Sequence, residues 1–194
     1  DPLDRLSKYL NASLFFPPEV LGMHIGPERS HTTIRRVSFK EGAQMALFGD
    51  AGFEIDLTDI NSEQKTYLNT WVLLYSRIRE LLPDCNLYRI DTADDQCAAQ
   101  LVSGDQSFSL ILIQQLVSHV NSYSKPLPLT GIDPSKAYKI SVLSEHEPDC
   151  HLYKRLPQWM FESNQKYLGS SLLDSGLRPC TLDPGQSLLI SLET

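Results

Sequence analysis

The side chains best suited to chemistry lie in the first third of the chain. His24, His31 and Arg35 come at the end of a short apolar segment, at 20–25, and just after it. Two carboxylates, Glu54 and Asp56, follow in the same region. Imidazoles and carboxylates can move protons, and all five side chains can hydrogen-bond a polar ligand. Acid–base chemistry or the binding of a polar ligand is therefore the first class of function to consider.

Two further carboxylates, Asp1 and Asp4, have a structural explanation. Asp1 is placed as a helix N-cap, Pro2 as the first helical residue, and Asp4 as an acidic residue in the first turn. A chain rarely starts on a helix cap without an initiator methionine. We therefore expect this sequence to be part of a longer one.

Composition excludes several classes of protein. The net charge of −7 argues against a surface that follows nucleic-acid phosphates. No apolar run approaches the roughly 18 residues of a membrane span, and no signal peptide is visible. We expect no nucleic-acid partner, no membrane partner and a cytoplasmic location.

Cysteine usage agrees with a reducing compartment. The four cysteines are widely spaced, at Cys85, Cys97, Cys150 and Cys180, and are expected to be thiols. Cys150 and His151, with His146 nearby, could begin a metal site, but further ligands at workable spacing are missing. We predict no metal and no cofactor.

Residues 1–82 alternate between helical and strand patterns. Helices are predicted at 3–14, 38–48 and 61–82, and short strands at 20–25 and 53–57. This order is typical of parallel α/β structure, and two strands alone make a poor sheet. We therefore expect the neighbouring strands to lie upstream.

Residues 83–194 follow a different pattern. Strands are predicted at 87–90, 98–102, 108–117, 137–143, 177–182 and 187–192, separated by turn-forming sequences. Many short strands with frequent turns favour an antiparallel β-sandwich. The segment 148–169 has no clear pattern.

Three motifs in order carry a resemblance to a known family. They are the segment 16–26 (FPPEVLGMHIG), then Ser30-His31-Thr32-Thr33 with Arg35, then the segment 46–57 (ALFGDAGFEIDL). Together they resemble glycoside hydrolase family 36, whose members include α-galactosidases. The closing segment, with Gly176-Leu177-Arg178-Pro179, is also similar. Two positions depart from the pattern: Ile34 stands where the family usually has glycine, and Gly42 where it usually has arginine.

The resemblance implies an architecture and a reaction. It implies the C-terminal portion of a (β/α)8 TIM barrel, from helix 6 to helix 8, at 1–82, followed by an antiparallel β domain at 83–194. The implied reaction is retaining hydrolysis of α-galactosides such as melibiose or raffinose by two aspartates. The resemblance places the acid/base aspartate three residues before Asp1 and the nucleophile farther upstream. We therefore expect this chain alone to be inactive. Whether the parent enzyme is a homo-oligomer stays open.

Several residues keep two interpretations. His24, at the carboxyl end of a barrel strand, could contact sugar hydroxyls or hydrogen-bond a loop carbonyl. His31 and Arg35 could bind substrate or brace their loop. Glu54 and Asp56 are expected to form ion pairs, for example with an arginine.

Aromatic residues and the overall function have competing interpretations too. Trp71 and Tyr75 are predicted to be core, while Trp159 could stack on a sugar or pack in a core. The rivals of the hydrolase are a non-catalytic carbohydrate-binding or interaction module, which would use 83–194, and a galactosyl transferase of the same family.

Overall fold

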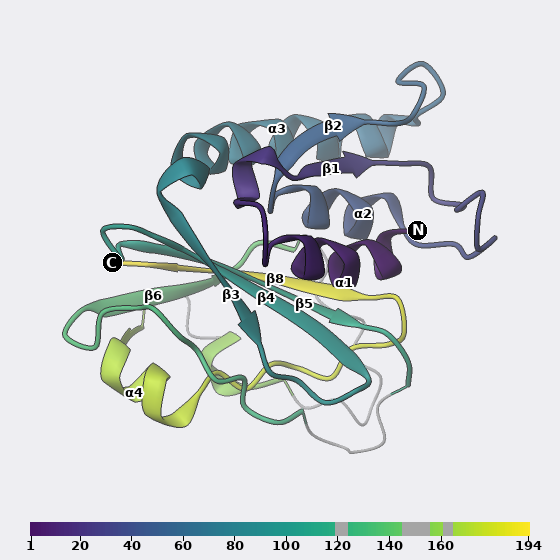
Figure 1. The fold of residues 1–194 in the computed structure, drawn as a ribbon. Helices are drawn as coiled ribbons and strands as arrows, with labels where there is room; N and C mark the ends of the chain where they lie inside the picture. The colour runs from purple at the N-terminus through teal and green to yellow at the C-terminus, as the bar shows by residue number, and fades with distance from the viewer. Residues whose placement is uncertain (119–123, 145–155, 161–164) are drawn as a thin grey trace. The chain divides into compact units, whose positions relative to one another are not determined.

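The computed structural model describes residues 1–118, 124–144, 156–160 and 165–194. Within these ranges the chain forms two compact units, Asp1–Cys85 and Asn86–Thr194 (Figure 1). Most of the unassigned segment 148–169 lies outside the described residues.

The first unit alternates helices and strands as its sequence pattern predicts. Its elements are α1 (Pro2–Ala12), η1 (Pro18–Val20), β1 (Gly22–Ile25), α2 (Phe39–Ala46), β2 (Asp50–Phe53), α3 (Ser62–Leu81) and η2 (Leu82–Asp84). β1 and β2 pair in parallel, with His24 opposite Gly52 and Ile25 opposite Phe53. The parallel pairing that is typical of this alternating order is therefore observed, and Figure 1 shows the two strands side by side.

Helices α2 and α3 begin where their capping sequences predict. Ser38 and Glu41 form a capping box at the start of α2, and Asn61 and Gln64 form another at the start of α3. Each box satisfies two backbone N–H groups that the helix itself leaves unpaired. The indole N–H of Trp71 on α3 donates to the carbonyl of Ala43 on α2, at 2.7 Å, and ties the two helices together.

The prediction of a strand at 53–57 is wrong, because β2 occupies Asp50–Phe53. The alternation of apolar residues suggested the later position. In the structure the ladder ends with the N–H of Glu54, which donates to the carbonyl of Ile25 at 2.9 Å. The Asp56 carboxylate then accepts the N–H and hydroxyl of Thr58, at 2.8 and 2.7 Å, and turns the chain.

The second unit contains one six-stranded sheet in the order β3-β4-β5-β8-β6-β7. Its strands are β3 (Cys85–Ile90), β4 (Gln96–Ser103), β5 (Phe108–Gln115), β6 (Ala137–Val142), β7 (Lys166–Leu168) and β8 (Ser187–Glu193). The pairs β4–β5, β5–β8, β6–β8 and β6–β7 are antiparallel. The antiparallel prediction is thus confirmed for these pairs.

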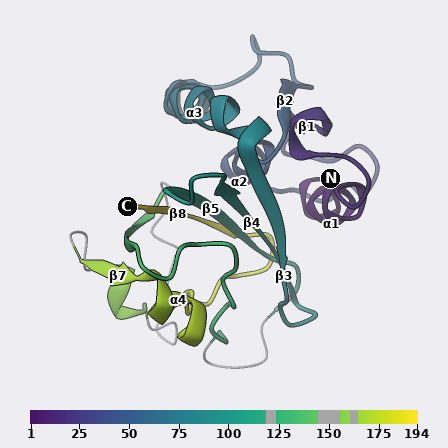
Figure 2. The same ribbon diagram turned by 60° about the vertical axis from the view of Figure 1, so that its left-hand side comes forward.

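The prediction of a β-sandwich is wrong for the described strands of this unit. They form one sheet instead of two facing sheets. Helix α4 (Gly169–Ser175), the short helix η3 (Gln158–Met160) and irregular segments supply the second layer; Figure 2 shows α4 beside β7. The predicted strand at 177–182 is absent apart from a bridge between Leu127 and Leu177.

The core of this unit lies on one face of the sheet. Alternation along β5 and β8 places Ile111, Ile113 and Ile190 on that face, in one cluster with Leu127 and Leu177 from the irregular segments. The opposite face carries Leu101, Leu110, Leu112 and Leu189 by the same register. Among the described helices, none combines the length and apolar character needed to cross a bilayer.

Candidate functional site

The carboxyl ends of β1 and β2 bring polar groups onto one face of the two-stranded sheet. Met23 and Ile25 point to the buried side of β1, so His24 points to the other side. Its neighbour in the register is Gly52. A Cβ atom on Gly52 would lie only 2.7 Å from Cδ2 of His24. The imidazole therefore lies directly over the glycine, and a larger residue there would displace it.

Arg5, His24 and Glu54 form a cluster at this end of the strands. A guanidinium nitrogen of Arg5 lies 3.3 Å from Oε2 of Glu54, and Nδ1 of His24 lies 3.4 Å from Oε1. Arg5 also donates to the main-chain carbonyl of His24. The predicted ion pair of Glu54 with an arginine is thus confirmed.

The prediction of an ion pair for Asp56 needs correction. The Asp56 carboxylate accepts hydrogen bonds from the side chain and the backbone N–H of Thr58 instead. These bonds lower the pKa of Asp56 below its usual value. The Nδ1 atom of His24 faces the Glu54 carboxylate, and this contact does not decide between the two interpretations of His24. The role of Arg5 was missed, because one arginine in the first turns of an amphipathic helix carries no distinguishing sequence signal.

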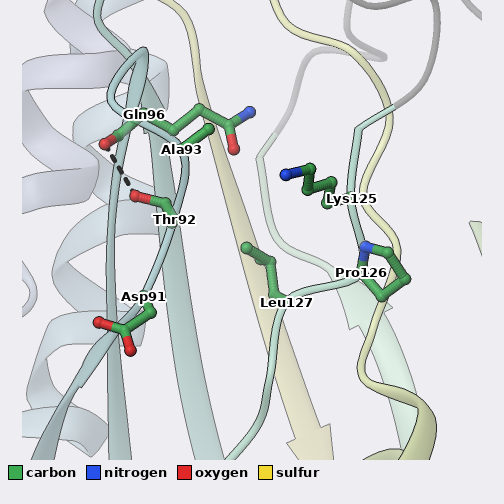
Figure 3. Close-up of a pocket in the computed structure, with 7 residues that line it drawn as sticks. All are labelled: Asp91, Thr92, Ala93, Gln96, Lys125, Pro126 and Leu127. Carbon is green, nitrogen blue, oxygen red and sulfur yellow. Dashed lines mark hydrogen bonds between the residues drawn. The ribbon is translucent and has the colours of Figure 1, made fainter.

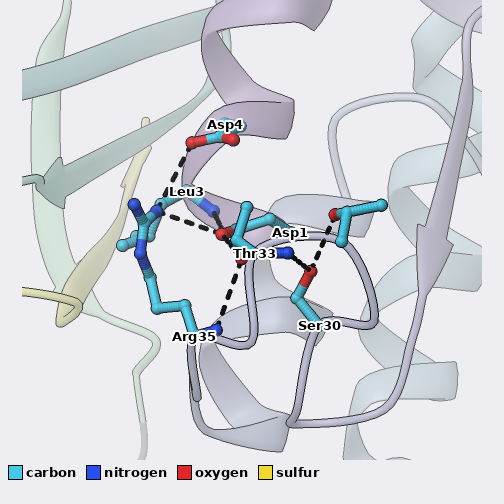
Figure 4. Close-up of polar contacts among 7 residues, drawn as sticks. Asp1, Leu3, Asp4, Ser30, Thr33 and Arg35 are labelled. Atoms are coloured by element: carbon cyan, nitrogen blue, oxygen red, sulfur yellow. Dashed lines mark hydrogen bonds and ion pairs between the residues drawn. The ribbon is translucent and has the colours of Figure 1, made fainter.

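The loop after β1 is fastened to the start of α1 (Figure 4). The Asp1 carboxylate caps α1 by accepting the Leu3 N–H at 3.0 Å, and it also accepts the Thr33 hydroxyl. A guanidinium nitrogen of Arg35 lies 3.1 Å from Oδ2 of Asp1 and 3.4 Å from Oδ1 of Asp4. The Asp1 side chain is 2% exposed. We call these four residues, Asp1, Asp4, Thr33 and Arg35, the loop clamp.

Ile34, between two residues of the loop clamp, has an unusual backbone. Its φ is +61°, in the left-handed region that β-branched residues avoid. This is the position where glycine was expected from the resemblance. The side chain of Ile34 is 57% exposed, so packing contributes little to offset the strain. His31, in the same loop, is exposed.

Two of the surface cavities, one in each unit, have polar residues in their linings. One of about 370 Å³ lies in the first unit beside the ends of β1 and β2, lined in part by Glu28, Glu54, Asp56 and Gln64. The other, of about 270 Å³, lies in the second unit (Figure 3). Its lining consists of Asp91, Thr92, Ala93, Gln96, Lys125, Pro126 and Leu127.

The tryptophans belong to cores. Trp71 is 3% exposed and stacks on Tyr75, with ring centroids 5.0 Å apart. The Tyr75 hydroxyl accepts the N–H of Ala51 at 2.8 Å, which anchors β2 to α3. Trp159 is 9% exposed, and its indole N–H donates to the carbonyl of Arg178 at 2.8 Å. The core interpretation of Trp71 and Trp159 is therefore confirmed.

A metal site finds no support in the part of the chain that the structure describes, where no group of three His, Cys, Asp or Glu side chains is arranged to hold an ion. Cys150, His146 and His151 lie outside the described residues.

Comparison with known proteins supports the resemblance. Residues 1–84 match the Melibiase family, and residues 96–192 match the glycosyl hydrolase family 36 C-terminal domain. An α-galactosidase of Escherichia coli is 34% identical over the whole chain, which spans 28% of that relative. The α-galactosidase Mel36A of Lactobacillus acidophilus is 29% identical over 72% of this chain and 19% of its own length.

Solved structures show the same fold. The α-galactosidase AgaA of Geobacillus stearothermophilus, in complex with 1-deoxygalactonojirimycin, superposes with a TM-score of 0.82 at 23% identity. An α-galactosidase of Lactobacillus brevis gives 0.80 at 24% identity. This chain is covered completely in both, yet it spans only 24% and 25% of those chains. By its matching domains, the chain belongs to glycoside hydrolase family 36.

Proposed function

We propose that the complete protein hydrolyses terminal α-galactosides, of the melibiose and raffinose type, with retention of configuration. The observation that carries the proposal is the parallel pair β1–β2, which bears the family 36 motifs and ends in the cluster of Arg5, His24 and Glu54. In barrels of alternating strands and helices, active sites lie at the carboxyl ends of the strands. Variants of the relative AgaA have been solved with raffinose and with stachyose.

The two catalytic aspartates are proposed to lie upstream of Asp1. Retaining hydrolysis needs one carboxylate to attack the anomeric carbon and a second, about 5–5.5 Å away, to protonate the leaving oxygen. The carboxylates of this chain near the strand ends already have partners. Asp1 is engaged by Thr33 and Arg35, and Glu54 by Arg5. This supports a site in which 1–82 supplies the wall and an upstream segment supplies the reacting groups.

His24 is the strongest candidate for contact with the substrate. Its ring lies on the open face of β1, and Nδ1 faces Glu54, which leaves Nε2 for a sugar hydroxyl. His31 is proposed as a weaker contact from the loop that follows, and Arg35 is proposed to brace that loop. The guanidinium of Arg35 faces Asp1 and Asp4, and its side chain is 45% exposed.

The test is a product assay on the complete enzyme. Melibiose and raffinose should be cleaved, and proton NMR taken early in the reaction should show α-galactose before mutarotation. His24→Phe should raise KM for melibiose, because a phenyl ring has no Nε2 to bond a sugar hydroxyl. Absence of cleavage, or β-galactose as the first product, would contradict the proposal. A cytoplasmic location and a homo-oligomeric state stay predictions.

The rival binding-module function has one observation in its favour, the cavity of the second unit shown in Figure 3. A carboxylate, a hydroxyl, an amide and an ammonium group line it, and these could bind a sugar. Among the described residues that line it, however, none carries an aromatic ring, so these residues offer the apolar face of a sugar no stacking partner. Gln96→Ala should therefore leave raffinose binding unchanged. Transfer of galactose to a second sugar is distinguished from hydrolysis by a search for galactosylated products at high acceptor concentration.

A further inference from the structure

The loop clamp joins two segments that the chain brings separately to the same end of the strands. Thr33 and Arg35 belong to the loop after β1, and Asp1 and Asp4 belong to the first turn of α1. The contacts are an ion pair at 3.1 Å, another at 3.4 Å and the Thr33 hydroxyl on Asp1. The Asp1 side chain is 2% exposed and that of Arg35 45% exposed, so the pair is shielded from water on its carboxylate side only.

The loop is held in this geometry against its own backbone preference. Ile34 lies between Thr33 and Arg35 with φ at +61°. A left-handed conformation costs roughly 1–2 kcal/mol for a residue with a Cβ atom. Such strain persists where the surroundings over-determine the conformation, and it is found preferentially at functional sites. The Ile34 N–H bonds the carbonyl of Ser30 at 3.0 Å, and the Ser30 N–H bonds the carbonyl of Arg35 at 2.9 Å, so the loop closes on itself.

We propose that the Asp1–Arg35 pair is a positioning device for the general acid of the reaction. This inference rests on the proposed function. In a barrel of alternating strands and helices, the segment that enters a helix comes from the carboxyl end of the preceding strand, where the reacting groups lie. Asp1 is the point at which that segment enters α1, and Arg35 ties it to the loop after β1. Neither residue touches the reacting bond in this scheme; together they fix the direction from which the acid approaches the leaving oxygen.

The experiment compares two substrates in the complete enzyme. A 4-nitrophenyl α-galactoside has a good leaving group and needs little protonation, whereas the alkoxide leaving group of melibiose needs the acid. The variants are Arg35→Met, Arg35→Lys and Asp1→Asn. Asparagine can still cap α1 through Oδ1, while the amide NH2 that replaces Oδ2 can donate to the Thr33 hydroxyl but offers Arg35 no acceptor, so the charge and the Arg35 contact are removed together. Arg36→Met is the matched control, the same substitution one residue along the loop.

We expect Arg35→Met and Asp1→Asn to lower kcat/KM for melibiose by roughly tenfold or more, since small misplacements of catalytic groups cost up to about 100-fold. The aryl galactoside should lose less than about threefold. Arg35→Lys should recover part of the melibiose activity, and Arg36→Met should resemble the parent. The double variant should lose no more than Arg35→Met alone, because that substitution already removes the pair with Asp1.

Two other results would overturn the inference. Equal losses for both substrates, with a lowered unfolding midpoint, would show that the clamp is structural only, and the proposed hydrolase would stand. An unmodified complete enzyme that cleaves neither substrate would overturn the proposed function and this inference together.

Discussion

Gly52 lies so close to His24 that the imidazole occupies the space a side chain at position 52 would need. A Cβ atom there would be 2.7 Å from Cδ2 and 3.3 Å from Nε2 of His24. The two residues are opposite each other in the parallel register of β1 and β2. Glycine at this position therefore decides where the ring of the proposed substrate-contacting histidine can lie.

Gly52→Ala should rotate or shift the His24 ring and break its contact with Glu54. In the complete enzyme we expect a higher KM for melibiose, by about tenfold, as for the loss of one to two kcal/mol of binding. Gly26→Ala is the matched control, because a Cβ atom at Gly26 would meet nothing within 4 Å. Equal KM values for the two variants would contradict the proposed role of His24.

Ile34→Asn should stabilise the protein. Asparagine adopts the left-handed conformation more readily than a β-branched residue, so part of the roughly 1–2 kcal/mol of strain at φ +61° is relieved. We expect the free energy of unfolding to rise by about 1 kcal/mol. Ile34→Val keeps the β-branch and should give no gain. Denaturant titration of the complete enzyme measures the free energy of unfolding of both variants. A loss of stability in Ile34→Asn would show that side-chain contacts of Ile34 outweigh the strain.

The 194-residue chain by itself should not hydrolyse an activated aryl α-galactoside. The physical reason is the proposed location of both catalytic aspartates upstream, since removal of such groups costs many orders of magnitude in rate. The measurement is nitrophenol release by the purified chain, beside the complete enzyme at the same concentration. Turnover near that of the complete enzyme would place the reacting carboxylates within 1–194.

The second unit should fold by itself, and the first should not. β5 is bonded on both sides, to β4 and to β8, whereas β1 and β2 form a sheet of two strands. Short two-stranded sheets are marginal alone, because half of their backbone groups have no strand partner. Hydrogen exchange should therefore show protected amides in β5 of an 86–194 piece and fast exchange in β1 and β2 of a 1–85 piece. Protection throughout β1 and β2 would favour a self-sufficient small α/β domain.

Asp105 should titrate far below a normal aspartate. Its carboxylate accepts hydrogen bonds from the Ser103 hydroxyl, at 2.7 Å, and from the N–H and hydroxyl of Ser107. These bonds lower the pKa of Asp105 to about 2. Because the folded pKa is below the unfolded value of about 3.9, the stabilisation is present above pH 4 and is lost as the pH falls toward 2.

Carbon-13 NMR of the Asp105 carboxyl measures this pKa directly. The stability difference between the parent and Asp105→Asn should shrink across the same window, from pH 4 to pH 2. A midpoint near 4 for the Asp105 resonance would show that the Ser103 and Ser107 hydrogen bonds do not persist in solution.

Local sequence patterns predicted the helices of the first unit well. The capping boxes at Ser38 and Asn61, and the apolar stripe that includes Trp71, depend only on neighbours within a few residues. The motifs also led to the correct family, because their order and spacing are properties of the chain itself. Candidate residues were found where their type is unusual, as for His24 at a strand end.

Contacts between distant segments decided the rest. The position of β2 depends on pairing with β1 and on the Tyr75 hydroxyl, and both outweighed the apolar alternation at 53–57. One sheet formed where two were expected, because irregular segments carrying Leu127 and Leu177 cover its core face as a second sheet would. The link from Arg35 to Asp1 spans more than thirty residues, and the left-handed backbone of Ile34 depends on the closed loop around it. The sequence alone determined the residues and their local helices, whereas their partners came from tertiary packing, since a residue's type does not encode which distant group will lie beside it.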